Sequence, residues 1–403
     1  MGEAAARDAA SAWLAQARAD CLNGPEWPAL DTPPLRTAAV IGGGTMGADI
    51  TQALLAAGMR TRLVEVDVPA LARGVERVRS SLARAQARGR ITEDEVRQRL
   101  DRLLPTLDWT ELADVELAIE AVPERLALKQ DVLRRLDRAC PPHAWFASNT
   151  STLSIGALAA VCARPGRVIG THFLTPAHVT PLLEVVRGEA TSDATIAAAR
   201  ALAQRLRKLP VLIGDAWGFI GNRMFEGYLA QVDWLQLGGI PAARIDAAME
   251  QFGFALGPCR TIDLAGTDVI EAVLSERAQA LPGGWPPGYR AVSRRLAALG
   301  RFGRKSGRGH YLYEHGAPAR PDPELAALCA ELARALGIAP LPPLSDAAIA
   351  ARCVQPLIDE GRRLLADGVA RRAGDIDLVW VHGYGFPAAR GGPMHLARHM
   401  ETA

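Results

Sequence analysis

The sequence predicts an α/β domain with a parallel sheet, followed by all-α regions. Three observations support this prediction. Residues 37–67 have the order strand, glycine turn, helix, strand and acidic residue. Short apolar runs then alternate with helical stretches as far as residue 214, which is typical of a parallel sheet with helices on both faces. From Gly218 onward the signals are mainly helical.

The composition of the 403-residue chain fits two or three domains with sizeable cores, since 49% of its residues are hydrophobic. A net charge of +2 argues against an extended nucleic-acid surface. The six cysteines are scattered without a CxxC pair, so we expect neither a disulfide framework nor a metal site. We see no signal peptide and no apolar run long enough to span a membrane. We therefore expect a soluble, cytoplasmic protein.

The glycine turn has the residues that a dinucleotide site requires. The apolar run 38–41 leads into Gly42-Gly43-Gly44-Thr45-Met46-Gly47. Gly42 permits a tight turn, Gly44 lets the backbone approach a pyrophosphate, and Gly47 lets the following helix pack on the strand. The N-terminus of that helix would direct free amides and its dipole at the phosphates. A purely structural turn is the alternative, but the strand–turn–helix context favours a dinucleotide site.

Glu65 is the acidic residue of this unit. It follows the second apolar run and lies 18 residues after Gly47, close to the usual spacing for a carboxylate that binds the adenosine ribose diol. An acid at this position favours NAD, because NADP sites tend to carry Arg. Asp67 is a nearby alternative for the role.

Three polar residues follow predicted strands in the remainder of the α/β region. Glu124, Ser151 and His172 come after the runs 115–119, 145–147 and 167–170. In a parallel sheet these residues would meet at the carboxyl edge, where ligands bind. The Arg-rich helix expected over residues 69–88 is either a solvated helix face or a basic surface for a phosphate-bearing substrate.

His172 and Glu184 form the strongest candidate for acid–base chemistry. The run 181–186 could return as a strand beside the strand that ends at His172. A carboxylate inside an apolar run needs a partner, and an imidazole oriented by it would be a general base tuned near neutral pH. A structural ion pair is the alternative. His178 competes for the role, but its position in the intervening loop gives it no fixed partner.

Two further polar residues could hold a substrate oxygen. Ser151 ends the cluster Ser148-Asn149-Thr150-Ser151, which could equally cap a helix. Asn222 lies on an otherwise apolar helix near its start and faces either solvent or the cleft.

The chain divides into five expected segments. These are an N-terminal helix and Pro-containing connector (1–35), an α/β domain (36–214), a helical domain (215–313), a linker (314–345) and a second helical domain (346–403). A faint repeat relates the helical domains. Arg223, Gly239, Ile245-Asp246, Gly253-Phe254 and Gly257-Pro258 recur in order as Arg352, Gly368, Ile376-Asp377, Gly385-Phe386 and Gly392-Pro393.

Motifs throughout residues 36–403 resemble the (S)-3-hydroxyacyl-CoA dehydrogenase family, specifically the dehydrogenase part of multifunctional fatty-acid β-oxidation enzymes. The matching segments are AAVIGGGTMG, AIEAVPERLALK, FASNTSTLSI, GTHFLTPAHVTPLLEVVRG, WGFIGNRM, GRKSGRGHYLY and GDIDLVWVHGYGFPAARGGP. The hydratase domain that precedes this unit in those enzymes is absent from the sequence, and residues 1–35 loosely resemble its linker helix.

The resemblance implies a Rossmann-type NAD-binding domain followed by two tandem C-terminal helical modules. It implies that His172 is the catalytic base, that Glu184 orients it, and that Ser151 and Asn222 hold the substrate oxygen. The positions implied to bind NAD are Gly42, Gly44, Thr45, Met46, Gly47, Glu65, Glu124, Lys129, Ser151 and Thr175.

Three positions depart from the family pattern. Thr175 replaces a usual Asn, Trp217 replaces a usual Pro, and Leu396 stands where multifunctional relatives tend to have a substrate-contacting Tyr. These departures bear on substrate choice more than on reaction type.

We therefore expect reversible, NAD-linked oxidation of a (S)-3-hydroxyacyl-CoA to the 3-ketoacyl-CoA, with the CoA over the Arg-rich helix near Arg84 or Arg88. Tandem modules favour a monomer over a homodimer, and a separate enoyl-CoA hydratase is a candidate partner.

Two alternative functions stay open. One is a biosynthetic dehydrogenase that acts on a carrier-protein-bound or unusual acyl thioester. The other is a non-catalytic NAD-binding scaffold.

Overall fold

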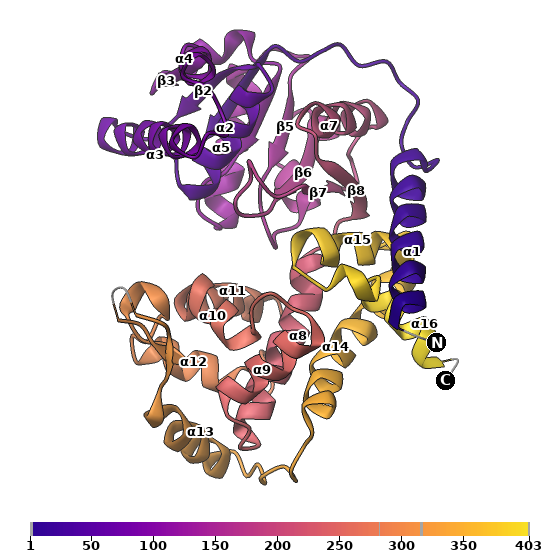
Figure 1. Cartoon of the computed structure of the whole chain (residues 1–403). Helices are drawn as coiled ribbons and strands as arrows, with labels where there is room; N and C mark the ends of the chain where they lie inside the picture. The colour runs from indigo at the N-terminus through magenta and orange to yellow at the C-terminus, as the bar shows by residue number, and fades with distance from the viewer. Residues whose placement is uncertain (1–2, 282, 315–316, 402–403) are drawn as a thin grey trace. The chain divides into compact units, whose positions relative to one another are not determined.

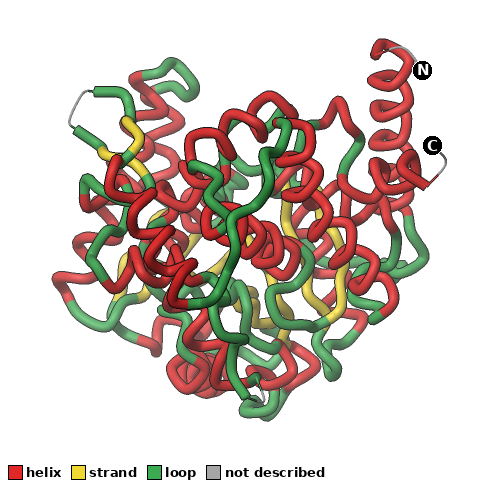
Figure 2. The backbone as a smooth tube through the Cα atoms, turned by 90° about the horizontal axis from the view of Figure 1, so that it is seen from below, coloured by secondary structure: helices red, strands yellow, loops and turns green. Residues whose placement is uncertain are grey.

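The computed structural model describes residues 3–281, 283–314 and 317–401. The chain forms two compact units, which we describe separately. The α/β unit contains residues 11–221 and 364–384, and the helical unit contains the described parts of residues 1–10, 222–363 and 385–403. Helix is the predominant regular structure (Figure 2).

The α/β unit is built on one eight-stranded sheet of order β3-β2-β1-β4-β5-β6-β7-β8 (Figure 1). The strands are β1 (Thr37–Ile41), β2 (Arg60–Val64), β3 (Leu103–Thr106), β4 (Leu117–Glu120), β5 (Trp145–Ser148), β6 (Val168–Phe173), β7 (Leu182–Arg187) and β8 (Leu209–Gly214). The first six run parallel. β7 is antiparallel to β6, and β8 is parallel to β7. The predicted parallel sheet is confirmed for β1–β6, and the expected return of β7 beside β6 is confirmed as well. β8, which was not predicted as a strand, is parallel to β7 and therefore runs opposite to the first six strands.

Helices cover this sheet and bury its apolar strands. They are α2 (Thr45–Ala56), α3 (Val68–Ala87), α4 (Glu93–Leu100), α5 (Leu126–Ala139), α6 (Ile155–Ala159) and α7 (Asp193–Arg205). All residues of β1 and β4–β6 are buried, as expected for strands covered on both faces. The hydrophobic core includes Val40, Leu54, Leu63 and Ile119. This core holds the strands in place, and the polar residues that follow them lie at the carboxyl edge of the sheet.

The N-terminal helix α1 (Glu3–Asn23) also contributes to the α/β unit. Trp13 Nε1 donates a hydrogen bond to Asp377 of α15 (Ala373–Gly383) at 2.8 Å. Near the end of α1, the Cys21 thiol donates to the Pro210 carbonyl of β8 at 3.2 Å. The helix therefore packs against both α15 and the last strand of the sheet.

The helical unit begins within α8 (Gly221–Leu237). We expected this helix from Gly218, but Gly218 and Phe219 have φ values of 71° and 55°, which an α-helix does not allow. The other helices are α9 (Ala242–Phe252), α10 (Pro258–Ala265), α11 (Thr267–Ala280), α12 (Ala291–Ala298), α13 (Pro323–Ala335), α14 (Asp346–Ala366) and α16 (Pro393–Glu401). A short hairpin of β9 (Tyr311–Leu312) and β10 (Arg320–Pro321) shows that this region is not wholly helical.

The segment 314–345 was expected to be a proline-rich linker around one short helix at 323–336, and α13 confirms that helix. Leu325, Cys329 and Ala333 of this helix are buried, so α13 packs as part of the helical unit. None of the helices in the described ranges is long and apolar enough to cross a membrane.

Candidate active site

The glycine turn has the geometry of a phosphate-binding loop. Gly42 has a φ of 100°, and its amide donates to the Val64 carbonyl at 2.9 Å. A Cβ on Gly47 would lie 1.8 Å from the Gly42 oxygen, whereas a Cβ on Gly44 would meet no described atom within 4 Å. Gly44 precedes α2, and no side chain caps this helix. The tight turn, the open approach and the uncapped helix N-terminus fit a pyrophosphate.

The structure places Glu65 against this turn. Glu65 Oε1 accepts a hydrogen bond from the Gly43 amide at 2.6 Å. The Asp67 carboxylate instead accepts from the Ala70 amide at 2.7 Å and caps α3. Arg77 of α3 donates to the Gly43 carbonyl at 3.2 Å. Of the two acids weighed for the ribose, Glu65 is therefore the one beside the glycine turn.

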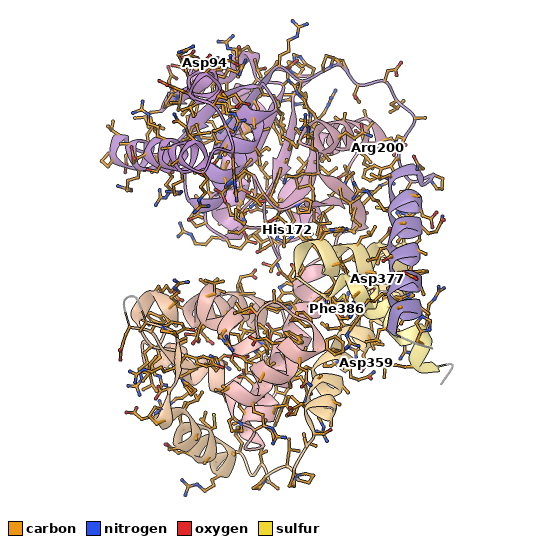
Figure 3. All side chains as sticks on the ribbon, viewed as in Figure 1. Asp94, His172, Arg200, Asp359, Asp377 and Phe386 are labelled. Carbon is orange, nitrogen blue, oxygen red and sulfur yellow. The ribbon has the colours of Figure 1, made fainter. Side chains whose placement is uncertain are left out.

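His172 and Glu184 are directly opposite each other on the antiparallel strands β6 and β7. Figure 3 labels His172 in the α/β unit. His172 Nδ1 lies 2.5 Å from Glu184 Oε2, and the two residues are 6% and 0% exposed. Because Nδ1 donates to a carboxylate, Nε2 is left as the nitrogen that can take up a proton. The arrangement is that of a general base oriented by a carboxylate.

The second oxygen of Glu184 is held by the backbone. Glu184 Oε1 accepts hydrogen bonds from the amides of Ile220 and Gly221 at 3.3 and 3.1 Å. The Phe219 ring lies 5.6 Å from the His172 ring. The positive φ of Phe219 is part of the tight turn that brings these amides to the buried carboxylate.

Glu124 organises the residues that follow β5. Glu124 Oε1 accepts from Thr150 Oγ1 at 2.5 Å, from the Ser151 amide at 2.9 Å and from Ser151 Oγ at 3.3 Å. Burial raises the pKa of the Glu124 carboxyl, but the Lys129 ammonium and the hydrogen bonds from Thr150 and Ser151 hold that pKa below its ordinary value. Ser151 is thereby fixed beside a carboxylate that stays ionised at neutral pH.

Lys129 is buried beside Glu124, with its side chain only 1% exposed. Its ammonium contacts Glu120 Oε1 at 2.8 Å and Glu124 Oε2 at 3.1 Å. Glu120 also accepts from Ser148 Oγ at 2.6 Å. Sequence reasoning did not select Glu120 or Ser148 for a role, although a carboxylate at the end of an apolar strand is the same signal that singled out Glu184.

The loop between β6 and β7 contacts α2. Thr175 Oγ1 donates to Met46 Sδ at 2.9 Å. His178 Nδ1 lies 3.3 Å from Asp49 Oδ1. The expectation that His178 has no fixed partner is therefore wrong, because α2 brings a carboxylate to it.

The remaining predicted residues lie on α3 or in the helical unit. Asn222 directly follows Gly221 but belongs to the helical unit, so its role stays a prediction. Leu396 lies on α16 of the helical unit. Arg84 and Arg88 are exposed at the end of α3. Within the described ranges no three His, Cys, Asp or Glu side chains form a metal-binding group.

The geometry agrees with comparisons to known proteins. Residues 37–216 match the family described as 3-hydroxyacyl-CoA dehydrogenase, NAD binding domain, and residues 218–313 match its C-terminal domain. The peroxisomal bifunctional enzyme of Danio rerio is 40% identical over 387 residues, covering 93% of this chain and 53% of that protein. The chain thus spans about half the length of the curated relatives it matches.

Two solved structures support the same assignment. The (S)-3-hydroxybutyryl-CoA dehydrogenase from Ralstonia eutropha is 34% identical with a TM-score of 0.65, and the match covers 70% of this chain and 100% of that one. The 3-hydroxybutyryl-CoA dehydrogenase from Escherichia coli is 28% identical with a TM-score of 0.78, and the match covers 91% of this chain and 92% of that one. The chain therefore belongs to the 3-hydroxyacyl-CoA dehydrogenase family, with an NAD-binding domain followed by a helical C-terminal domain.

Proposed function

We propose that this chain catalyses the reversible, NAD-dependent oxidation of (S)-3-hydroxyacyl-CoA to 3-ketoacyl-CoA, as in fatty-acid β-oxidation. The observation that carries the proposal is the His172–Glu184 pair. This pair is buried on β6 and β7 of an NAD-binding domain. Oxidation of a hydroxyl group requires a base that takes up its proton while hydride leaves the carbon. An imidazole whose Nδ1 is bound to a carboxylate supplies that base.

The proposed mechanism assigns one task to each residue. His172 Nε2 takes the proton of the 3-hydroxyl, and Glu184 stabilises the imidazolium that forms. Ser151, held by Glu124, and Asn222 hold the substrate oxygen. When bound, NAD supplies the acceptor for the hydride that leaves C3. In the reverse direction His172 returns the proton to the carbonyl oxygen.

The proposed NAD site uses the glycine turn and its neighbours. Gly42, Gly44 and Gly47 shape the loop, and the amides of Thr45 and Met46 at the start of α2 would face the pyrophosphate. Glu65 would move a carboxylate oxygen from the Gly43 amide to the ribose diol. Glu124, Lys129, Ser151 and Thr175 complete the proposed set. Since Lys129 is fully engaged with Glu120 and Glu124, we assign its effect to the orientation of Glu124.

We further propose that residues 346–403 are a second copy of the helical module in 215–313. The order α8–α9–α10 parallels α14–α15–α16. α9 and α15 both have 11 residues, and α10 and α16 both begin at proline. Gly253 and Gly385, which follow α9 and α15 closely, both have positive φ values. The adjacent Phe254 and Phe386 pack edge to face with ring centroids 5.6 Å apart.

This pairing of the two copies supports a monomer, since the second copy covers part of the surface of the first. The boundaries of the three domains remain predictions, at 36–214, 215–313 and 346–403. A cytoplasmic location also remains a prediction, and the Danio rerio relative is by contrast named a peroxisomal enzyme. A separate enoyl-CoA hydratase remains a proposed partner.

The test is acetoacetyl-CoA-dependent oxidation of NADH by the purified chain, followed at 340 nm. We expect turnover with NADH and much slower turnover with NADPH, because Glu65 repels a 2′-phosphate. An acetoacetyl group on acyl carrier protein serves as the second substrate. Turnover with the carrier-bound substrate alone would favour the biosynthetic alternative. NADH binding without turnover of either substrate would favour a scaffold.

A further inference from the structure

The loop between the catalytic strands is attached to the dinucleotide-binding helix. Residues 174–181 join β6, which carries His172, to β7, which carries Glu184. Three of these loop residues contact α2. Thr175 Oγ1 donates to Met46 Sδ at 2.9 Å, the Ala177 amide donates to Asp49 Oδ2 at 3.3 Å, and His178 Nδ1 lies 3.3 Å from Asp49 Oδ1.

Asp49 is the centre of this attachment. Its two carboxylate oxygens go to two successive loop residues, Ala177 and His178. Met46 and Asp49 are three positions apart on α2, so they lie on the same face of the helix. The side chains of Asp49 and His178 are 16% and 25% exposed, which leaves their interaction only partly screened by water.

The attachment connects the two halves of the proposed site. The α2 N-terminus follows the glycine turn, whereas the loop joins the paired strands β6 and β7 that carry His172 and Glu184. A loop anchored only at its ends would sample many conformations, and ordering it on cofactor binding would cost free energy. A loop already attached to α2 would avoid that cost.

We propose that Asp49 and His178 are positioning residues that hold the 174–181 loop against α2 in the geometry that binds NAD. This inference rests on the proposed function and extends it to two residues without an assigned role. Asp49 and His178 do not touch the reacting atoms. They hold Thr175 and the rest of the 174–181 loop beside α2, whose N-terminus would face the pyrophosphate.

The test measures NADH dissociation by fluorescence in the absence of acyl substrate, at pH 7. The variants are Asp49→Asn, His178→Ala and the double variant. Asn keeps an oxygen that can accept from the Ala177 amide but removes the charge beside His178. Saturating-NADH kcat with acetoacetyl-CoA is measured in parallel, so that binding and chemistry are separated.

Asp137→Asn is the matched control. Asp137 Oδ2 also accepts a hydrogen bond from a backbone amide, that of Ala163, at 2.6 Å. Its Oδ1 pairs with a cation, Arg164 Nε, at 2.7 Å. The exposed fractions of this pair, 9% and 25%, are close to those of Asp49 and His178. The control lies on α5 and the loop that follows α6, and not on α2 or the β6–β7 loop.

We expect each single variant to raise the NADH dissociation constant about fivefold, the upper end for a partly exposed pair. The double variant should not exceed this effect, because both changes break one interaction. The saturating kcat should fall less than about twofold. Asp137→Asn should lower the melting temperature while leaving NADH affinity unchanged.

Two results would overturn the inference while leaving the proposed function intact. One is NADH affinity within the measurement error of wild type for both single variants. The other is a double variant whose loss equals the product of the single losses, which would mean that the residues act separately. Failure of the wild type to bind NADH would instead contradict the proposed function itself, and the loop's role with it.

Discussion

The Glu184 carboxylate divides its two oxygens between the His172 imidazole and the backbone. Oε2 contacts His172 Nδ1, while Oε1 accepts hydrogen bonds from the amides of Ile220 and Gly221. A buried carboxylate is tolerated only when its hydrogen-bonding capacity is satisfied, and here the backbone and one imidazole satisfy it. The same contacts fix the direction of the imidazole that we propose as the base.

Replacing Glu184 with Gln should separate these two tasks. The amide keeps the shape and one accepting oxygen but loses the charge that stabilises an imidazolium. We expect the kcat for acetoacetyl-CoA reduction to fall by roughly 10²-fold, with NADH affinity within about twofold of wild type. A kcat within a factor of three of wild type would show that Glu184 has only a structural role.

Glu124 makes the free energy of unfolding depend on pH in the acidic range. Burial raises its pKa, but Lys129 and the hydrogen bonds from Thr150 and Ser151 lower it below the ordinary value. The unfolded chain therefore binds more protons than the folded one, so this stabilisation is present above the unfolded pKa and is lost as pH falls through the folded pKa. The free energy of unfolding should fall from about pH 5 downward, and less steeply in Glu124→Gln. Parallel pH profiles for the two proteins would contradict this assignment.

Residues that interrupt or end apolar runs were marked by a local pattern, whereas the contact between Asp49 and His178 was not. Glu65, Glu184 and His172 interrupt or end apolar runs, so the sequence itself marks them as polar groups beside a buried strand. Asp49 is one more polar residue on a helix, and His178 lies in a loop. Their proximity depends on how the β6–β7 loop folds onto α2, which no local pattern specifies.

At the scale of elements, the Lys129 ammonium attaches α5 to the sheet. It contacts Glu120 at the end of β4, and Glu120 accepts from Ser148 at the end of β5. Lys129→Ala would leave the buried Glu120 carboxylate without its cation. We expect a loss of about 3–5 kcal/mol in the free energy of unfolding, measured by urea denaturation.

Lys305→Ala is the control for this measurement. The Lys305–Asp268 pair is 48% and 39% exposed, so its loss should cost less than about 1 kcal/mol. Equal effects of the two substitutions would show that Lys129 does not attach α5 to the sheet in the way described.

The predicted elements were those whose signals are local. β1, α2 and β2 follow from the glycine turn and its flanking apolar runs. β3 and β8 were not predicted as strands, and each contains a proline, Pro105 and Pro210, which counts against a strand in sequence reasoning. The late start of α8 was missed because Phe219 has a positive φ, a conformation uncommon for a non-glycine residue.

At the scale of the whole molecule, the proposed second module is the feature that would keep the chain monomeric. Phe386 is 2% exposed, and its ring packs edge to face against Phe252 and Phe254 of the first module. Phe386→Ala should lower the free energy of unfolding by about 3–5 kcal/mol. Leu299→Ala, at a residue 46% exposed, should have little effect.

Sedimentation analysis of the same proteins would test the consequence for assembly. We expect a monomer for the wild type and Leu299→Ala, and concentration-dependent association for Phe386→Ala as the apolar surface of the first module opens. A stable wild-type dimer would contradict the idea that the second module covers this surface.

The central claim is that His172 is the general base of an NAD-linked dehydrogenase. The most direct test compares acetoacetyl-CoA-dependent NADH oxidation by wild type and His172→Ala, with NADH affinity measured alongside. We predict wild-type turnover, a loss of about 10²–10⁴ in kcat for the variant, and unchanged NADH affinity. A variant whose kcat stays within tenfold of wild type would contradict the claim and move the search for the base to another residue.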